Sequence, residues 1–167
     1  MKTTILAIAV MLSATQANAG TDTSPAIDIT WVKEGQTLVR GTHRFVNTSG
    51  GLVPFMATSQ QQFPYSTCTL EGNTPSYQAK QLAVGRMLLL KPQRTSRGTI
   101  YLDIQAEDTE VRTVKSTDNG SCTSFAPVIG GLPLTTLSVE LPESGPLTVS
   151  FPDGHYSLTL RVGGDPM

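Results

Sequence analysis

The chain has 167 residues, of which 15% are charged, and its formal net charge at pH 7 is −1. The 12 basic and 13 acidic residues are nearly balanced. Proteins that bind nucleic acid or an anionic membrane surface usually carry a basic patch, so we expect neither partner here. No apolar run of the mature sequence approaches the roughly 20 residues that a membrane-spanning helix needs, so we expect no membrane span.

The first 19 residues have the pattern of a secretory signal peptide. Lys2 precedes an apolar run from Ile5 to Leu12, and Ala17-Asn18-Ala19 follows as a small-residue cleavage site. The apolar run is too short to cross a membrane as a helix. We therefore expect cleavage after Ala19 and export to the periplasm or the medium of a bacterial cell. Residues 20–167 then form one domain of ordinary size.

The two cysteines, Cys68 and Cys122, both lie in the exported part. In an oxidising compartment, two cysteines most simply form one disulfide. A metal site would need more ligands than the two histidines of the chain can add, and a redox pair usually has Cys-x-x-Cys spacing. We therefore predict a structural Cys68–Cys122 disulfide, which would stabilise the fold by roughly 4 kcal/mol on the chain-entropy model.

Short runs of alternating apolar and polar residues, separated by Gly, Pro, Asn and Asp, dominate the mature sequence and predict β-strands. In the first half, residues 27–32 and 37–46 alternate on either side of Glu34-Gly35, which reads as a turn. Residues 52–58 and 64–70 are weaker strand candidates. Residues 72–77 read as a loop, in which Thr74-Pro75 has the chemistry to start a short helical turn.

The middle of the chain contains the most apolar stretch of the mature sequence, residues 81–91. Apolar side chains on both of its faces predict a central strand that is covered above and below. Residues 99–105 alternate cleanly and predict a hairpin partner for it. Residues 106–108 read as a turn, and residues 109–116 as a weak strand. Asp118-Asn119-Gly120 is a strong tight-turn signal, and Cys122 follows it, so the disulfide would tie this hairpin to residues 64–70.

In the last third, residues 136–141, 147–151 and 156–162 alternate in turn and predict a three-strand meander with one buried face. In all, about eight to ten short strands with frequent turn signals are expected. We therefore predict an all-β fold, an antiparallel β-sandwich or a Greek-key barrel, held by one disulfide.

Catalytic and metal-binding patterns are weak. His43 and His155 are the available general bases, but no serine lies in a Gly-x-Ser-x-Gly motif, and a triad is recognised by its geometry. The acidic group of Glu107, Asp108 and Glu110 reads as a solvated turn rather than a glycosidase pair, and with Asp103 it lacks the spacing of a calcium loop. We therefore expect no enzyme activity, no cofactor and no metal.

Two groups of residues suggest binding instead. A basic segment, which we expect at a hairpin tip, contains Lys91, Arg94 and Arg97. Aromatic residues that supply contact area in many binding sites are Phe63, Tyr65, Tyr77 and Tyr101. Each group also fits ordinary surface or core packing.

These features favour an exported, non-enzymatic binding or structural protein of the bacterial envelope, such as an accessory subunit of a pilus or secretion assembly. Its partner would be a protein, and oligomers would form through exposed sheet edges. Residues 27–32 or 156–162 are the candidate exchanged or added strands. The alternatives are a binder of a small ligand or carbohydrate, or an inhibitor of a secreted hydrolase.

Overall fold

The computed structural model describes residues 26–94 and 99–163, and this part of the chain consists of strands and connecting turns without a helix. The predicted signal peptide, the last four residues and Arg97 lie outside the described residues. The strands are β1 (Ala26–Lys33), β2 (Gln36–Arg44), β3 (Asn47–Thr48), β4 (Gly51–Leu52), β5 (Phe55–Glu71), β6 (Thr74–Arg94), β7 (Ile100–Asp118), β8 (Thr123–Glu140), β9 (Gly145–Ser150) and β10 (Tyr156–Val162).

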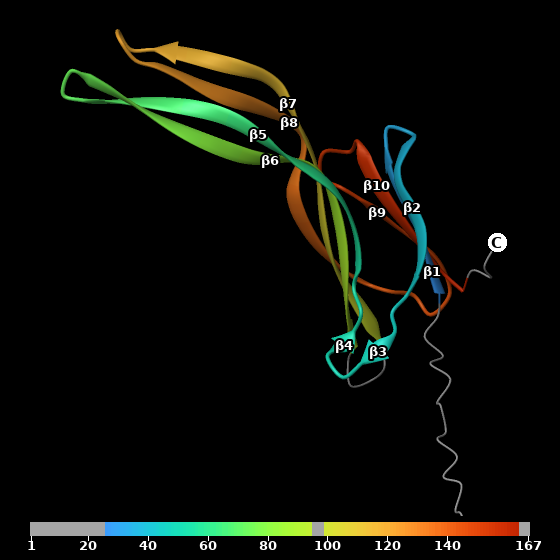
Figure 1. Cartoon of the computed structure of the whole chain (residues 1–167). Coiled ribbons are helices and arrows are strands. Elements are labelled where there is room, and N and C mark those ends of the chain that lie inside the picture. Colours follow the sequence, from blue (N-terminus) through green and yellow to red (C-terminus); the bar gives the residue numbers. More distant parts are fainter. Residues whose placement is uncertain (1–25, 95–98, 164–167) are drawn as a thin grey trace, which may run out of the picture.

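Two four-stranded antiparallel sheets face each other (Figure 1). The first sheet has the strand order β2-β1-β10-β9, and the second has the order β5-β6-β7-β8. β3 and β4 form a separate short ladder in the connection from β2 to β5. The chain leaves the first sheet after β2 and returns to it at β9, so paired strands are consecutive in sequence, except for β1 and β10. The predicted all-β sandwich is confirmed, with up-and-down rather than Greek-key connections.

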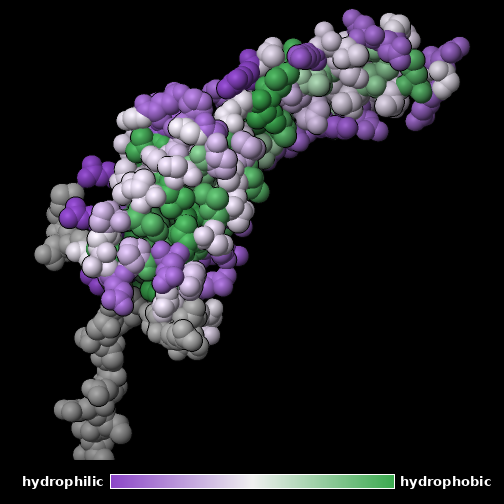
Figure 2. Space-filling view, turned by 180° about the vertical axis from the view of Figure 1, so that it is seen from behind, coloured by the Kyte–Doolittle hydropathy of each residue, from purple (hydrophilic) through white to green (hydrophobic). Residues whose placement is uncertain are grey.

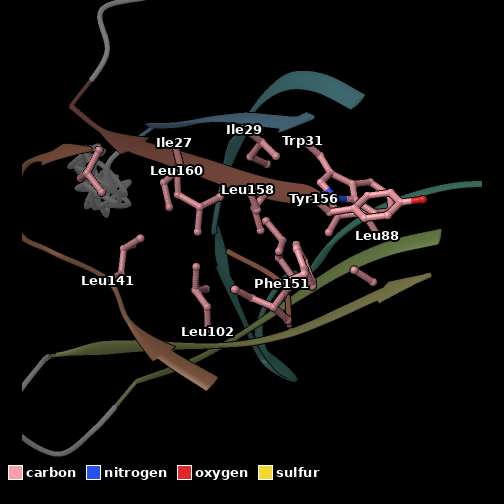
Figure 3. Packing of buried hydrophobic residues seen from close by; sticks show 14 of the residues in the cluster. Ile27, Ile29, Trp31, Leu88, Leu102, Leu141, Phe151, Tyr156, Leu158 and Leu160 are labelled. Carbon is pink, nitrogen blue, oxygen red and sulfur yellow. The ribbon is translucent and has the colours of Figure 1, made fainter. Parts of the chain in front are cut away.

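The hydrophobic core lies between the two sheets (Figure 3). β1 contributes every second side chain, Ile27, Ile29 and Trp31, because alternate residues of a strand face the same side. The other fully buried large side chains are Phe45, Leu88, Leu90, Leu102, Ile104, Leu132, Leu158 and Leu160. Burying one such side chain stabilises the fold by roughly 1.5–3 kcal/mol, so this cluster is the main source of stability.

Four strands are far longer than the short strands that the sequence predicts. β5, β6, β7 and β8 have 17, 21, 19 and 18 residues, whereas a typical strand has about 5–6. Their far ends project beyond the sandwich as a pair of hairpins (Figure 1). We call residues 61–84 and 110–130 the arm, and the other described residues the body. None of the clustered core residues belongs to the arm.

The second sheet divides at the base of the arm. The β6–β7 ladder ends at the pair Gly85 and Thr109, while the β5–β6 and β7–β8 ladders continue to their turns. Two glycines at this level have positive φ angles, 130° at Gly85 and 97° at Gly131. A Cβ on Gly85 would lie 2.4 Å from the Ser59 carbonyl oxygen, and one on Gly131 would lie 2.0 Å from that of Asp108. Only glycine fits these bends.

Within the arm the two hairpins come together again, now through β5 and β8 (Figure 1). In the body these two strands are opposite edges of the second sheet. The Cys68–Cys122 disulfide joins the hairpins across a sequence separation of 54 residues, with 5.6 Å between the Cα atoms. The Ser124 hydroxyl accepts from the Cys68 N–H at 2.8 Å and donates to the Cys68 carbonyl at 3.1 Å. The predicted disulfide and the two segments it ties are confirmed.

Several predicted boundaries are wrong. The segments 52–58 and 64–70 are joined into one strand, β5, and residues 106–108 do not turn the chain but lie within β7. A register shift between Ala106 and Asp108 interrupts the alternation there and imitates a turn. Thr74-Pro75 starts β6, with no helical turn. Within the arm only Val84 and Cys122 are buried, so the arm residues lack the regular pattern of a half-buried sheet.

The pairing of the terminal strands also differs from the prediction. Residues 136–140 form the end of β8 in the second sheet, and Leu141 follows that strand. Only β9 and β10 of the predicted meander therefore pair with each other. The candidate added strands, 27–32 and 156–162, are the two inner strands of the first sheet, because β1 pairs with both β2 and β10. Their backbone groups are already paired on both sides, so neither is a free edge.

Candidate functional site

The arm carries a face of partly exposed apolar side chains. On β5, Phe63 and Tyr65 alternate to one side. On the other hairpin, Phe125 is opposite Ser116, and Val114 shares the Ser116 side of β7. Phe125 is 43% exposed and Val114 is 41% exposed. We call the side of the arm that carries these four apolar residues the arm face.

An open cleft of about 340 Å³ lies on the arm face. Its lining consists of Phe63, Pro64, Tyr65, Ser66, Val114 and Phe125. In the space-filling view, apolar residues continue from the body into the arm, and hydrophilic residues gather at the far end (Figure 2). Exposed apolar patches with a polar rim are typical of protein interaction sites. The cleft brings together two of the four predicted aromatic residues.

The other two aromatic residues lie elsewhere. Tyr77 pairs with Cys68 in the β5–β6 ladder, is 58% exposed, and faces away from the arm face. Tyr101 lies in the body, where its hydroxyl donates to Glu140 Oε2 at 3.1 Å. This hydrogen bond raises the pKa of Tyr101. The predicted aromatic set is therefore divided between the arm and the body.

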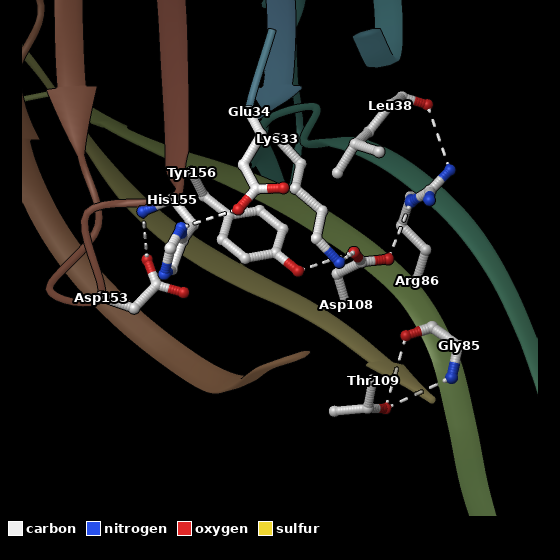
Figure 4. A network of polar contacts seen from close by, with 10 residues as sticks. All are labelled: Lys33, Glu34, Leu38, Gly85, Arg86, Asp108, Thr109, Asp153, His155 and Tyr156. Atoms are coloured by element: carbon white, nitrogen blue, oxygen red, sulfur yellow. Dashed lines mark hydrogen bonds and ion pairs between the residues drawn. The ribbon is translucent and has the colours of Figure 1, made fainter. Parts of the chain in front are cut away.

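A polar network at the base of the arm joins the two sheets of the body (Figure 4). Asp108 of β7 has a side chain that is only 13% exposed. It accepts from Arg86 Nε at 3.1 Å and from the Tyr156 hydroxyl at 2.9 Å, and Lys33 Nζ lies 3.7 Å from it. Arg86 also reaches the Leu38 carbonyl at 3.4 Å. A buried carboxylate needs such partners, and here they come from both sheets.

The network shifts two pKa values. Burial raises the pKa of Tyr156; the interaction with Lys33 lowers it in part, and the hydrogen bond to Asp108 raises it again, so that the net shift is upward. The pKa of Lys33 is also raised, first by its hydrogen bond with Tyr156 and then by the nearby charges of Asp108 and Glu110. Both shifts keep the neutral phenol and the charged ammonium in place over a wide pH range. The network therefore links β6 and β7 of the second sheet to β1 and β10 of the first sheet at the base of the arm.

The other predicted acidic residues do not gather into a site. Glu107 accepts from Gln60 Nε2 at 3.0 Å, and Asp103 accepts from Gln93 and Ser138. Glu110 contributes charge near Lys33. In residues 26–94 and 99–163, no group of three or more histidine, cysteine or acidic side chains is placed to hold a metal ion.

The two histidines are held by other groups. His155 Nδ1 lies 2.9 Å from Glu34 Oε1, and both side chains are more than 60% exposed. His43 packs edge-on against the rings of Phe45 and Phe55, and its Nε2 lies 3.2 Å from the Val53 carbonyl oxygen. Within the described part of the chain, these contacts bring no serine hydroxyl to either ring. Of the basic segment, Lys91 is exposed on β6, whereas the side chains of Arg94 and Arg97 are outside the described structure.

A second cleft, of about 290 Å³, lies on the outer face of the first sheet. Its polar lining includes Arg40, Arg161, Thr42 and Asp28, and Thr42 donates to Asp28 at 2.7 Å. Sequence reasoning missed this cleft. The sequence shows Arg40-x-Thr42 in β2 and Thr159-x-Arg161 in β10. These residues lie in one cleft only because β1 pairs with both β2 and β10, and the sequence does not reveal the β1–β10 pairing.

No protein-family model matches the chain, and no curated protein or solved structure matches it either. Across the two described ranges, no helix has the length and apolar character required to cross a membrane.

Proposed function

We propose that the protein is an exported, non-enzymatic binding or structural protein of the bacterial envelope, and that its arm is the element that contacts a protein partner. In this role it acts as an accessory subunit of a surface assembly such as a pilus or a secretion machine. The signal-peptide pattern of residues 1–19 supports export, and the disulfide fits an oxidising compartment.

The observation that carries the proposal is the arm itself. Hairpins that leave the core gain little stability from apolar burial, yet ordering each residue costs roughly 1–2 kcal/mol. The two hairpins of this arm are joined by a disulfide and by the Ser124 hydrogen bonds, and the arm presents apolar side chains to solvent. Such a rigid, exposed and partly apolar projection is suited to recognition, because a preorganised surface loses little entropy on binding.

Export is tested on the full chain expressed in its own host. We expect periplasmic or extracellular material that begins at Gly20 and contains no free thiol, measured by cell fractionation and mass spectrometry. Material that stays in the cytosol with residues 1–19 attached would refute the envelope location.

Partner contact is tested by placing a photo-crosslinking residue at Phe125 on the arm. The matched control is Leu134, which lies on the same strand but in the body and is 58% exposed. We expect a discrete crosslinked protein from position 125 and none from position 134. Equal crosslinking from both positions, or none from position 125, would refute the arm as the binding element.

The second cleft favours one alternative, a binder of small acidic ligands such as an acidic sugar. Arg40 and Arg161 are both exposed there beside threonine hydroxyls, and guanidinium groups bind carboxylates in a bidentate manner. We expect acidic monosaccharides to raise the melting temperature of the wild-type protein and of Lys91→Ser, but not of Arg161→Ser. An equal response of all three proteins would exclude this site.

A further inference from the structure

We propose that the arm face is self-complementary, so that the arms of two copies of this chain pair in antiparallel fashion. This inference rests on the proposed function, because it names a second copy of the chain as one partner of the arm. It follows from the order of apolar and charged side chains along the face.

The strand register places acidic and basic groups on the same face as the aromatic side chains. On β5, Glu71 alternates to the same side as Phe63 and Tyr65, and Lys80 of β6 is directly opposite Tyr65. On β7, Asp118 shares the side of Val114. From the tip inward, the arm face therefore carries two carboxylates, then the aromatic cleft with Lys80 beside it.

This order makes the arm face complementary to itself in only one orientation. The span from Tyr65 to Glu71 is about 20 Å along an extended strand. If two arms lie face to face and parallel, like charges meet, which is unfavourable. If one is turned about a two-fold axis, the acidic tip of each copy lies over Lys80 of the other. A two-fold interface requires such a self-complementary surface.

The same arrangement covers the exposed apolar groups. The axis would fall about 10 Å from the tip, midway between the acidic and basic groups. Phe125, which follows shortly after Cys122 at the tip, lies near this level on β8. Its ring would meet the cleft of the second copy. An overlap of about 20 Å of arm buries less area than a standard protein interface, so we expect a weak pair with a dissociation constant of about micromolar or higher.

The test is the oligomeric state of the oxidised mature protein, measured by sedimentation velocity over about a hundredfold concentration range. We expect a monomer–dimer equilibrium for the wild type and an unchanged equilibrium for the control Leu134→Asp. Phe125→Asp should weaken the dimer at least tenfold. A wild type that remains monomeric throughout would overturn the inference.

Charge exchange distinguishes arm pairing from other modes of association. Glu71→Lys and Lys80→Glu alone should each weaken the dimer, and the double variant should restore it. Within one chain these residues lie about 20 Å apart, well beyond the Debye length of about 8–10 Å in physiological salt, so rescue reports a contact between copies. Absence of rescue would overturn the antiparallel pairing.

The outcome also separates this inference from the proposed function. A monomeric protein whose position 125 still crosslinks to a different envelope protein would refute self-pairing and leave the arm as the binding element. Crosslinks from position 125 to a second copy of the chain would support both.

Discussion

Replacing Cys68 and Cys122 by serine tests how the disulfide stabilises the arm. For the closed loop of 54 residues, the chain-entropy model gives about 4 kcal/mol at 25 °C. If only the arm opens, the β6–β7 ladder keeps the loop closed at Gly85 and Thr109, which leaves about 30 flexible residues. Because the entropy depends on the logarithm of loop length, the stabilisation falls only to about 3.5 kcal/mol.

The loss should be confined to the arm, since the core cluster contains no arm residue. A free-energy loss of 3.5 kcal/mol corresponds to roughly 300-fold less protection from amide exchange. Hydrogen exchange with peptide-level mass spectrometry measures this directly, by comparing peptides from residues 61–84 and 110–130 with peptides from β1 and β10. Arm peptides that exchange as slowly as in the wild type, or body peptides that lose as much protection as the arm, would refute the reasoning.

The base of the arm gives three more predictions, each measured as the free energy of unfolding in urea. Asp108→Asn should lower the free energy of unfolding by about 2 kcal/mol, because it leaves Lys33 and Arg86 without a charged acceptor. The control Glu107→Gln should lower it by less than about 1 kcal/mol. Equal losses in the two variants would contradict the assigned network. Gly131→Ala should lower the free energy of unfolding by about 3 kcal/mol, because its Cβ would overlap the Asp108 carbonyl at a φ of 97°. The control Gly72→Ala has free space around its Cβ and should lower it by about 1 kcal/mol. A tolerated Gly131→Ala would show that the bend does not require glycine. Because the pKa values of Tyr156 and Lys33 are raised in the folded state, their contribution to the free energy of unfolding should be complete from neutral pH to about pH 10, the ordinary pKa of tyrosine. That contribution should decline above about pH 10, as the pH passes the raised pKa values. Tyr156→Phe should make that decline shallower, and an unchanged slope would exclude Tyr156 as its source.

The sequence predicts what depends on local chemistry. Alternation around Glu34-Gly35 predicts the first hairpin, and Asp118-Asn119-Gly120 predicts the turn beside Cys122, where Gly120 adopts a φ of 68°. The apolar run of residues 81–91 predicts a central strand, and residues 85–90 lie in β6 between β5 and β7. Residues 81–84 pair with β5 alone, and only the side of Val84, Leu88 and Leu90 is buried, so the predicted cover on both faces is wrong. In each case the residues that predict the element are the same short segment that forms it.

Features that depend on partners far away in sequence were missed. Alternation indicates which face of a strand is buried, but not which strand lies beside it, so the β1–β10 pairing and the transfer of β8 to the second sheet could not be read. Within the arm only Val84 and Cys122 are buried, so its strands show a weak pattern. Phe63 and Tyr65 are among the predicted binding residues, whereas Phe125 is not. The three residues line one cleft only because β5 and β8 meet beyond the body.

The up-and-down order has a consequence for how the protein reaches its native state. Most ladders join strands that are consecutive in the sequence, so each hairpin can form once its two strands are present. The pairing of β1 with β10 is the exception among the described ladders, since it connects the two ends of the domain. β9 and β10, half of the first sheet, can therefore join β1 and β2 only after the last strand has been synthesised. A chain that is still being synthesised can form its earlier hairpins, but it cannot complete its core until β10 is present to pair with β1.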